Sequence, residues 1–218
     1  MPLPRLRTLS TYICTILLGM STGVVAVEKD LPAVGEGRLS NMMASIPAYN
    51  EYATNVLMAD MDPAVLPELM ALEAEEDYAD SRFTDLLFKH HYVYHVLRMP
   101  LEAWPDEINR AFGHMNTDVY TPMQGPSELG ASGLLADWDR TADIKRITVP
   151  TLVIGATYDT MDPAHMQWMV EEIPSARFLL CPNGAHLAQW DDEENYFNDL
   201  NSLLKDIDAG KFVRGSES

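Results

Sequence analysis

Cysteine is scarce in this sequence, which contains two cysteines, Cys14 and Cys181, among 218 residues. Their positions match neither a disulfide framework nor the close spacing of metal-binding cysteines. Cys181 closes the apolar run 177–181, as is typical of a small residue in a core strand. The cysteines therefore predict neither a disulfide-stapled domain nor a thiolate metal site, and they define no redox compartment.

Positive charge is also scarce. The sequence has 15 Lys and Arg residues against 33 Asp and Glu residues, which gives a formal net charge of −18. Such a field repels phosphate, so nucleic acid and anionic membranes are poor partners. It favours cationic ligands, such as the free amino terminus of a peptide. Most of the acidic side chains are nevertheless expected to form a solvated surface.

The sequence lacks an uninterrupted hydrophobic run that could span a membrane, which takes roughly 20 apolar residues. The most apolar stretch, 12–27, is interrupted by threonine, glycine and serine. Residues 1–26 nonetheless resemble a secretory signal peptide, with two arginines near the start and small residues at the end. Such a signal would imply a secreted or periplasmic protein.

What the sequence does contain is two kinds of periodicity. Helices are predicted over 48–59, 64–76, 80–97 and 105–115. From residue 143 onward, strands over 151–156 and 177–181 alternate with helices over 163–172 and 191–207. This alternation predicts an α/β fold with a parallel sheet, whose ligands bind at the carboxyl ends of the strands.

Each of the two predicted strands leads into a loop with a titratable side chain. Asp159 follows the first strand and His186 follows the second, with one helix between them. A catalytic triad needs a carboxylate that fixes the tautomer of its histidine, and α/β-hydrolases supply acid and base in this order. Asp162, directly before Pro163, fits better as a helix N-cap. Asp159 alone or His186 alone could be an ordinary loop residue, but the spacing of these two residues favours a catalytic pair.

A nucleophile is harder to place. Gly19-Met20-Ser21-Thr22-Gly23 matches the G-x-S-x-G nucleophile elbow, which makes Ser21 the candidate. However, the β-branched residues and Pro32 that follow disfavour the required helix. The residues before Gly19 are too few for the earlier strands and the second oxyanion donor. The stretch therefore fits a signal peptide, or out-of-frame sequence of a truncated gene, about as well as it fits a nucleophile elbow. Most N-terminal strands of the core are expected to be missing.

Further motifs recur in a fixed order along the chain. They are Ser40-Asn41-Met42-Met43-Ala44-Ser45, His95-Val96-Leu97-Arg98-Met99 with Trp104-Pro105, Gly125-Pro126-Ser127-Glu128, Asp137-Trp138-Asp139, Val149-Pro150-Thr151-Leu152 and Gly184-Ala185-His186. On these motifs, roughly residues 40–207 resemble the proline iminopeptidases, α/β-hydrolase aminopeptidases that include the tricorn-interacting aminopeptidase. The resemblance implies a helical cap over a hydrolase core, a cytoplasmic location and no metal or cofactor. It also implies release of an N-terminal residue, typically proline, from a short peptide or an amino-acid amide.

The resemblance also assigns roles to residues. Asp159 looks like the triad acid and His186 like the triad base, and Glu128 resembles the cap glutamate that receives the substrate's amino group. A carboxylate beside a buried ammonium is strongly favoured where water is excluded. Trp104 and Trp138 could line a proline-sized apolar pocket, although tryptophans are more often core residues.

Two departures from the family affect this interpretation. Many relatives carry a second amine-binding glutamate directly after the triad acid, where this sequence has Thr160. A segment rich in histidine and glycine that would form the oxyanion hole is absent. The first departure leaves the substrate preference open, and the second leaves the activity open. His91 and His95, four residues apart, lack a third zinc ligand and are expected to pack within the cap.

The predicted organisation follows from these assignments. It comprises an atypical segment 1–39, the end of a core strand 40–47, a helical cap 48–140, the C-terminal half of the hydrolase core 141–210 and a tail 211–218. The favoured function is a serine aminopeptidase with a Ser-His-Asp mechanism. The alternatives are a catalytically dead remnant that acts as a binding module, or an esterase or epoxide hydrolase on the same scaffold. The sequence does not define the oligomeric state.

Overall fold

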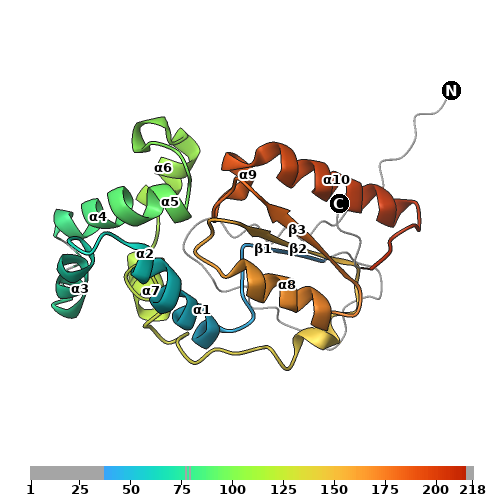
Figure 1. Ribbon diagram of the computed structural model, residues 1–218, viewed down its shortest axis with the longest axis horizontal. Coiled ribbons are helices and arrows are strands. Elements are labelled where there is room, and N and C mark those ends of the chain that lie inside the picture. Colours follow the sequence, from blue (N-terminus) through green and yellow to red (C-terminus); the bar gives the residue numbers. More distant parts are fainter. Residues whose placement is uncertain (1–36, 77, 79, 215–218) are drawn as a thin grey trace.

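A computed structural model describes residues 37–76, 78 and 80–214. It places a helical segment beside an α/β part that contains a parallel sheet (Figure 1). The strand order is β1 (Gly37–Ser40), β2 (Thr151–Ala156) and β3 (Ala176–Cys181), with Gly37 opposite Thr151 and Thr151 opposite Ala176. The predicted parallel sheet is therefore present, and β2 is its central strand.

Both faces of the sheet are covered by helices. Helix α8 (Pro163–Glu172) packs on one face, and α10 (Glu193–Asp208), preceded by the short α9 (Ala188–Asp191), packs on the other (Figure 1). This explains why all six residues of β2 are buried, and why the five that follow Thr151 are all non-polar rather than alternating with polar residues. Gly155 permits a close approach of α8, because a Cβ there would lie 2.9 Å from Cε of Met166.

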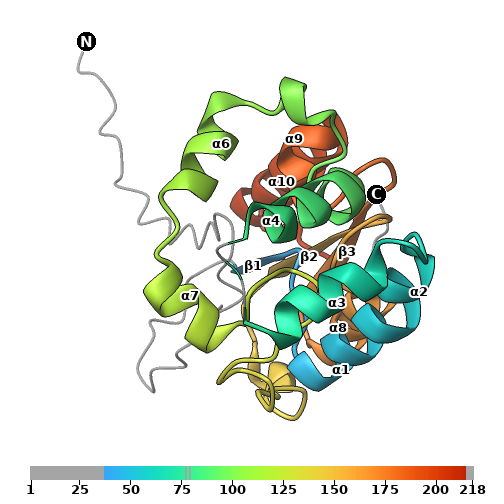
Figure 2. The same cartoon turned by 90° about the vertical axis from the view of Figure 1, so that its left-hand side faces the viewer.

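The helical segment lies between β1 and β2 in the chain (Figure 2). Its helices are α1 (Ile46–Tyr52), α2 (Met58–Asp60), α3 (Leu66–Ala74), α4 (Ser81–Leu87), α5 (Val93–His95), α6 (Asp106–Gly113) and α7 (Thr117–Met123). Five-residue π-helical turns join α1 to α2 and α4 to α5, so each pair forms one continuous rod. The four helices predicted for this region are present, with ends that differ by a few residues.

Two helices of the structure begin at an aspartate side chain that caps the helix N-terminus. Asp80 caps α4 by accepting a hydrogen bond from the backbone N–H of Arg82 at 2.8 Å. Asp162 caps α8 by accepting one from the N–H of Ala164, also at 2.8 Å. Helix α7 was not predicted, because it is only seven residues long and contains Pro122.

The start of the sheet differs from the predicted boundaries. Strand β1 begins at Gly37 and ends at Ser40, so it lies mostly in the predicted atypical segment 1–39 and only touches the predicted strand end 40–47. A four-residue strand that begins with glycine leaves almost no periodic signal in the sequence. The strand is fixed instead by its pairing with β2.

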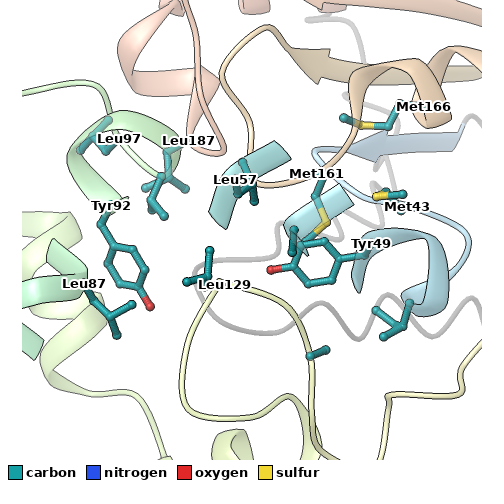
Figure 3. Close-up of a cluster of buried hydrophobic side chains, with 14 of the residues drawn as sticks. Met43, Tyr49, Leu57, Leu87, Tyr92, Leu97, Leu129, Met161, Met166 and Leu187 are labelled. Atoms are coloured by element: carbon teal, nitrogen blue, oxygen red, sulfur yellow. The ribbon is translucent and has the colours of Figure 1, made fainter. Parts of the chain in front are cut away.

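A continuous hydrophobic cluster joins the helical segment to the α8 face of the sheet (Figure 3). Its fully buried members include, from the helical segment, Tyr49, Leu57, Leu69, Leu97 and Ile108, and from the α/β part, Val153, Met161, Met166, Met169, Ile173 and Leu187. A second, smaller cluster lies between the sheet and α10. The helical segment thus shares a core with the sheet. Within the described part of the chain, no helix is both long and apolar enough to cross a lipid bilayer.

Candidate active site

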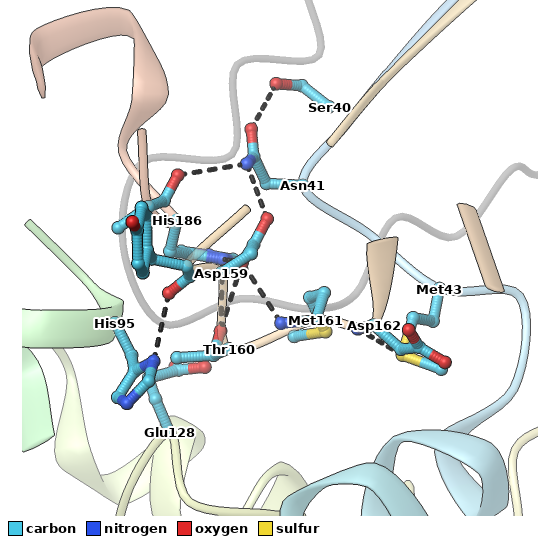
Figure 4. A network of polar contacts seen from close by, with 12 residues as sticks. Ser40, Asn41, Met43, His95, Glu128, Asp159, Thr160, Met161, Asp162 and His186 are labelled. Carbon is cyan, nitrogen blue, oxygen red and sulfur yellow. Dashed lines mark hydrogen bonds and ion pairs between the residues drawn. The ribbon is translucent and has the colours of Figure 1, made fainter. Parts of the chain in front are cut away.

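Asp159 and His186 meet at the carboxyl ends of β2 and β3 (Figure 4). The Nδ1 atom of His186 lies 2.9 Å from Oδ1 of Asp159. The carboxylate is fully buried, whereas the imidazole keeps 12 % of its side-chain surface exposed. The structure therefore brings together the two residues that the sequence predicted as acid and base.

The two loops that carry this pair are held to each other by backbone hydrogen bonds. Beyond the end of β2, the N–H of Thr157 donates to the carbonyl of Cys181, and the N–H of Tyr158 donates to that of Gly184, both at 3.1 Å. The parallel pairing of β2 and β3 thus continues into the loops. This continuation brings the acid loop and the base loop side by side.

The buried carboxylate of Asp159 is compensated by hydrogen-bond donors. Its Oδ1 accepts from His186 and from the backbone N–H of Met161 at 3.0 Å. Its Oδ2 accepts from Nδ2 of Asn41 at 2.6 Å. The Oγ1 atom of Thr160 lies 3.2 Å from Nδ1 of His186 and 3.4 Å from Oδ1 of Asp159. A buried carboxylate needs such hydrogen-bond donors to remain stable.

The surroundings of His186 favour its protonated form. Burial lowers the pKa of the imidazole, but the charge and the hydrogen bond of Asp159, with the charges of Glu128 and Asp191, outweigh burial, so the pKa is raised. Because Nδ1 faces a carboxylate, it carries the hydrogen in the neutral ring. The Nε2 atom then holds the free lone pair and can accept a proton.

Glu128 is a second buried carboxylate, 5 % exposed, in the loop after α7. Its Oε1 accepts a hydrogen bond from the hydroxyl of Tyr120 at 2.7 Å, and its backbone N–H donates to the hydroxyl oxygen of Tyr92 at 3.2 Å. Burial and the charge of Glu128 raise the pKa of both tyrosines, so they remain neutral. Among the described residues, no Lys or Arg forms an ion pair with Glu128. The site therefore offers a buried negative charge without a resident cation.

The end of α5 holds both loops through its backbone and one side chain. The N–H groups of His186 and Leu187 donate to the carbonyls of His95 and Val96, at 3.0 and 2.9 Å. The ring of His95 donates through Nδ1 to the carbonyl of Tyr158 at 3.0 Å. The helical segment thus contacts the acid loop and the base loop at once.

Arg98 also connects the end of the helical segment to both loops, an arrangement that we call the Arg98 clamp. Its Nη1 donates to the carbonyl of Asn183 at 2.8 Å, and its backbone N–H donates to Oδ2 of Asp191 at 2.9 Å. Its guanidinium lies over the ring of Tyr158. In the sequence, residues 95–99 are recognisable only as a family motif, and their pattern does not predict these contacts.

Other candidate residues do not join this group. Trp104 is 4 % exposed and packs against the rings of Phe88 and Phe112. Trp138 is half-buried, and its carbonyl accepts from the N–H of Ile46. Neither ring has a hydrogen bond or ring contact with the acid–base pair among the described residues, and their role in lining a pocket stays a prediction. Ser21 lies outside the described residues.

A metal site does not emerge from the described ranges, where no group of three or more His, Cys, Asp or Glu side chains is arranged to hold an ion. The rings of His91 and His95 are 5.0 Å apart between centroids. His91 donates through Nε2 to the carbonyl of Glu128 at 3.2 Å, and its buried Nδ1 has no partner in the described structure. Burial, followed by the neighbouring His95, lowers the pKa of His91 to about 3.

Comparison with known proteins identifies homologues. Proteins named proline iminopeptidase from Elizabethkingia meningoseptica, Flavobacterium johnsoniae and Chitinophaga pinensis are 48 %, 46 % and 42 % identical over 176, 173 and 169 residues. These alignments cover 80 %, 79 % and 78 % of this chain and 58 %, 58 % and 56 % of those proteins. The chain thus spans less than two thirds of the length of these relatives. No protein-family model matches the chain.

Two solved structures have the same fold. VinJ superposes with a TM-score of 0.72 at 25 % identity, covering 78 % of this chain and 57 % of VinJ. A proline iminopeptidase from Mycobacterium smegmatis superposes with a TM-score of 0.69 at 24 % identity, covering 80 % of this chain and 58 % of that one. The predicted α/β-hydrolase fold is therefore confirmed, as is the resemblance to the proline iminopeptidases.

Proposed function

We propose that this chain supplies the acid, the base and the amine-binding carboxylate of a serine aminopeptidase. The reaction is the release of an N-terminal residue, preferably proline, from a short peptide or an amino-acid amide. The hydrogen bond between Asp159 and His186 carries the proposal, because it joins two side chains from adjacent strand tips in the order that the mechanism requires. The names of the relatives favour this reaction over those of an esterase or an epoxide hydrolase.

In this mechanism His186 acts as general base and then as general acid. Its Nε2 takes the proton of the serine hydroxyl as the oxygen attacks the scissile carbonyl, and it then gives that proton to the leaving amine. A water molecule hydrolyses the resulting ester with the same assistance. Asp159 holds Nδ1–H and stabilises the imidazolium that forms in each step. Ser21 is the proposed nucleophile.

Glu128 is proposed to bind the substrate's ammonium group. One of its oxygens is held by Tyr120, and the other, which has no donor among the described residues, can accept from an N–H of the substrate. A protonated proline amine carries two such hydrogens, and a charge-assisted bond in a buried site is stronger than a neutral one. Thr160 is fully buried and offers a hydroxyl rather than a second charge. Glu128 is therefore proposed as the main determinant of the requirement for a free amine.

The domain division is proposed on the same basis. Residues 48–140 form the cap that presents Glu128, and 141–210 form the part of the core that presents Asp159 and His186. The backbone bonds from the end of α5 to the base loop support a cap held directly over these two residues.

The test uses the full chain with proline p-nitroanilide and a fluorophosphonate serine probe. We expect hydrolysis of the anilide and labelling by the probe, both abolished by Ser21→Ala, and a loss of hydrolysis of at least a thousandfold in His186→Gln. His114→Gln is the matched control, because His114 is exposed and its ring donates to the carbonyl of Arg110 in the same helix. A chain that binds prolyl peptides but reacts with neither reagent would be a binding module, against the proposal. Cleavage of p-nitrophenyl acetate without cleavage of the anilide would indicate an esterase.

A further inference from the structure

Asn41 occupies a special backbone position at the end of β1. Its N–H donates to the carbonyl of Ile154 at 2.8 Å, which continues the pairing with β2 by one residue. Its φ of 53° lies in the left-handed region, where asparagine, aspartate and glycine are tolerated best. The chain therefore turns sharply at Asn41, and the side chain, 5 % exposed, lies at the tips of β2 and β3 (Figure 4).

The amide group of Asn41 contacts both functional loops. Its Nδ2 donates to Oδ2 of Asp159 at 2.6 Å and to the carbonyl of Ala185 at 3.3 Å. An ionised carboxylate and a backbone carbonyl can only accept hydrogen bonds. The amide nitrogen must therefore face them, which settles the orientation of the amide. One of its hydrogens goes to the acid and the other to the residue before the base.

The oxygen of the same amide is anchored on the other side. Oδ1 of Asn41 accepts from the hydroxyl of Ser40 at 2.7 Å. Because Ser40 has then used its one hydrogen, the contact of 3.0 Å between its Oγ and the hydroxyl of Tyr196 has Tyr196 as donor. Tyr196 is 4 % exposed on α10, in the smaller hydrophobic cluster. The amide is thus tied to the helix that covers the far face of the sheet.

We propose that Asn41 is a positioning residue of this site, whose amide sets the separation of the acid and base loops and holds Asp159 with Oδ1 toward His186. The catalytic importance of Asn41 rests on the proposed function, whereas the hydrogen bonds that hold the two loops do not depend on it. A carboxylate rotates easily about its last bond. Among the described residues, Oδ1 of Asp159 is held by His186 and by the N–H of Met161, and Oδ2 is held by Asn41. Without Asn41, Oδ2 would lose this donor, and only the donors to Oδ1 would oppose rotation.

The experiment observes the hydrogen between the acid and the base directly. In the full chain with ¹⁵N-labelled histidine, the Nδ1–H resonance of His186 is identified by its loss in His186→Gln. Asn41→Gly keeps the left-handed backbone without strain and removes both bonds of the bridge. We expect exchange of the Nδ1 hydrogen with water to become at least tenfold faster in this variant. A residue that only stabilised the fold would not change this resonance selectively.

A second variant changes the charge and keeps the shape. Asn41→Asp replaces the two donated hydrogens by lone pairs and places a second carboxylate beside Asp159. The added negative charge should raise the midpoint of the His186 titration by about one pH unit, a tenfold change in its proton affinity. Asn50→Asp is the matched control, because Asn50 also donates to a backbone carbonyl, that of Ala131 at 2.9 Å, and has no contact with the pair. It should leave the resonance and the midpoint unchanged.

The outcomes separate this inference from the proposed function. A folded Asn41→Gly variant with the wild-type exchange rate would overturn the inference, and so would a folded Asn41→Asp variant with the wild-type midpoint. If Asn41→Asp does not fold, Asn41→Gly decides. No readout needs hydrolysis, so a chain that shows the expected changes but cleaves no prolyl anilide would refute the enzymatic proposal and leave the positioning role intact.

Discussion

The guanidinium of Arg98 lies over the ring of Tyr158, 3.5 Å from the ring centroid, and ties the helical segment to the loop that carries Asp159. The same side chain bonds to the carbonyl of Asn183 on the base loop. Both loops therefore depend on one exposed cation for part of their order.

Replacing Arg98 by methionine should loosen both loops without unfolding the protein. A cation–π contact at an exposed site contributes about 0.5–1 kcal/mol and a hydrogen bond about 1 kcal/mol, so the free energy of unfolding should fall by about 1–2 kcal/mol. Amide exchange at His186, whose N–H donates to the carbonyl of His95, should accelerate. Arg146→Met, which removes an exposed ion pair with Asp143, serves as control. Unchanged exchange at His186 would contradict the clamp.

His91 should make the protein sensitive to mild acid. Its pKa is about 3 in the folded state, against 6.5 when unperturbed, because burial and the neighbouring His95 disfavour its charge. A lowered folded-state pKa means that the unfolded chain binds the proton more tightly, so stability falls as the pH falls below 6.5. Between pH 7.5 and pH 5 this single group should cost about 2 kcal/mol of unfolding free energy. Denaturant titrations of wild type and His91→Gln at both pH values measure the difference, with His114→Gln as control.

His186 should have the opposite effect. Its folded-state pKa is raised, because the favourable interactions with Asp159, Glu128 and Asp191 outweigh its burial. The stability that these interactions provide is complete below the unfolded-state pKa and is lost as the pH rises through the raised folded-state pKa. The stability advantage of wild type over His186→Gln should therefore shrink from pH 6 to pH 9. An advantage that grew over this range would show that the pKa is lowered instead.

Removing the charge of Glu128 should weaken the binding of free amines selectively. A charge-assisted hydrogen bond contributes about 1.5–3 kcal/mol, so the Kd of prolinamide for Glu128→Gln should rise by about ten- to a hundredfold. Calorimetry on the full chain measures this directly. N-acetylprolinamide, which lacks the ammonium group, should bind wild type and variant equally. Glu107→Gln on the exposed face of α6 is the matched control.

The sequence predicted the acid–base pair because local features define it. An apolar strand, a loop with an acid and a capped helix can each be recognised within a few residues, and parallel strands bring their ends together. The N-cap at Asp162 and the helix 163–172 are predictable in the same way. Such features depend on nearest neighbours along the chain.

The remaining parts of the site depend on contacts between distant segments. Asn41 follows a four-residue strand with almost no periodic signal, and its importance appears only where its amide meets Asp159 and Ala185. The clamp at Arg98 and the burial of Trp104 likewise depend on packing that no local pattern encodes. The residue pair Ser40-Asn41, where the strand ends, is visible in the sequence only as part of a family motif.

The pairing of β1 with β2 has a consequence for biosynthesis. Asn41 and Asp159 are 118 residues apart in the chain, and the whole helical segment lies between them. During synthesis the chain leaves the ribosome amino terminus first, so β1 emerges before the helical segment and before its partner β2. Compaction of the helices shortens the loop that must close before β1 and β2 can pair. The bond between these two side chains can therefore form only after the whole segment between them has been synthesised.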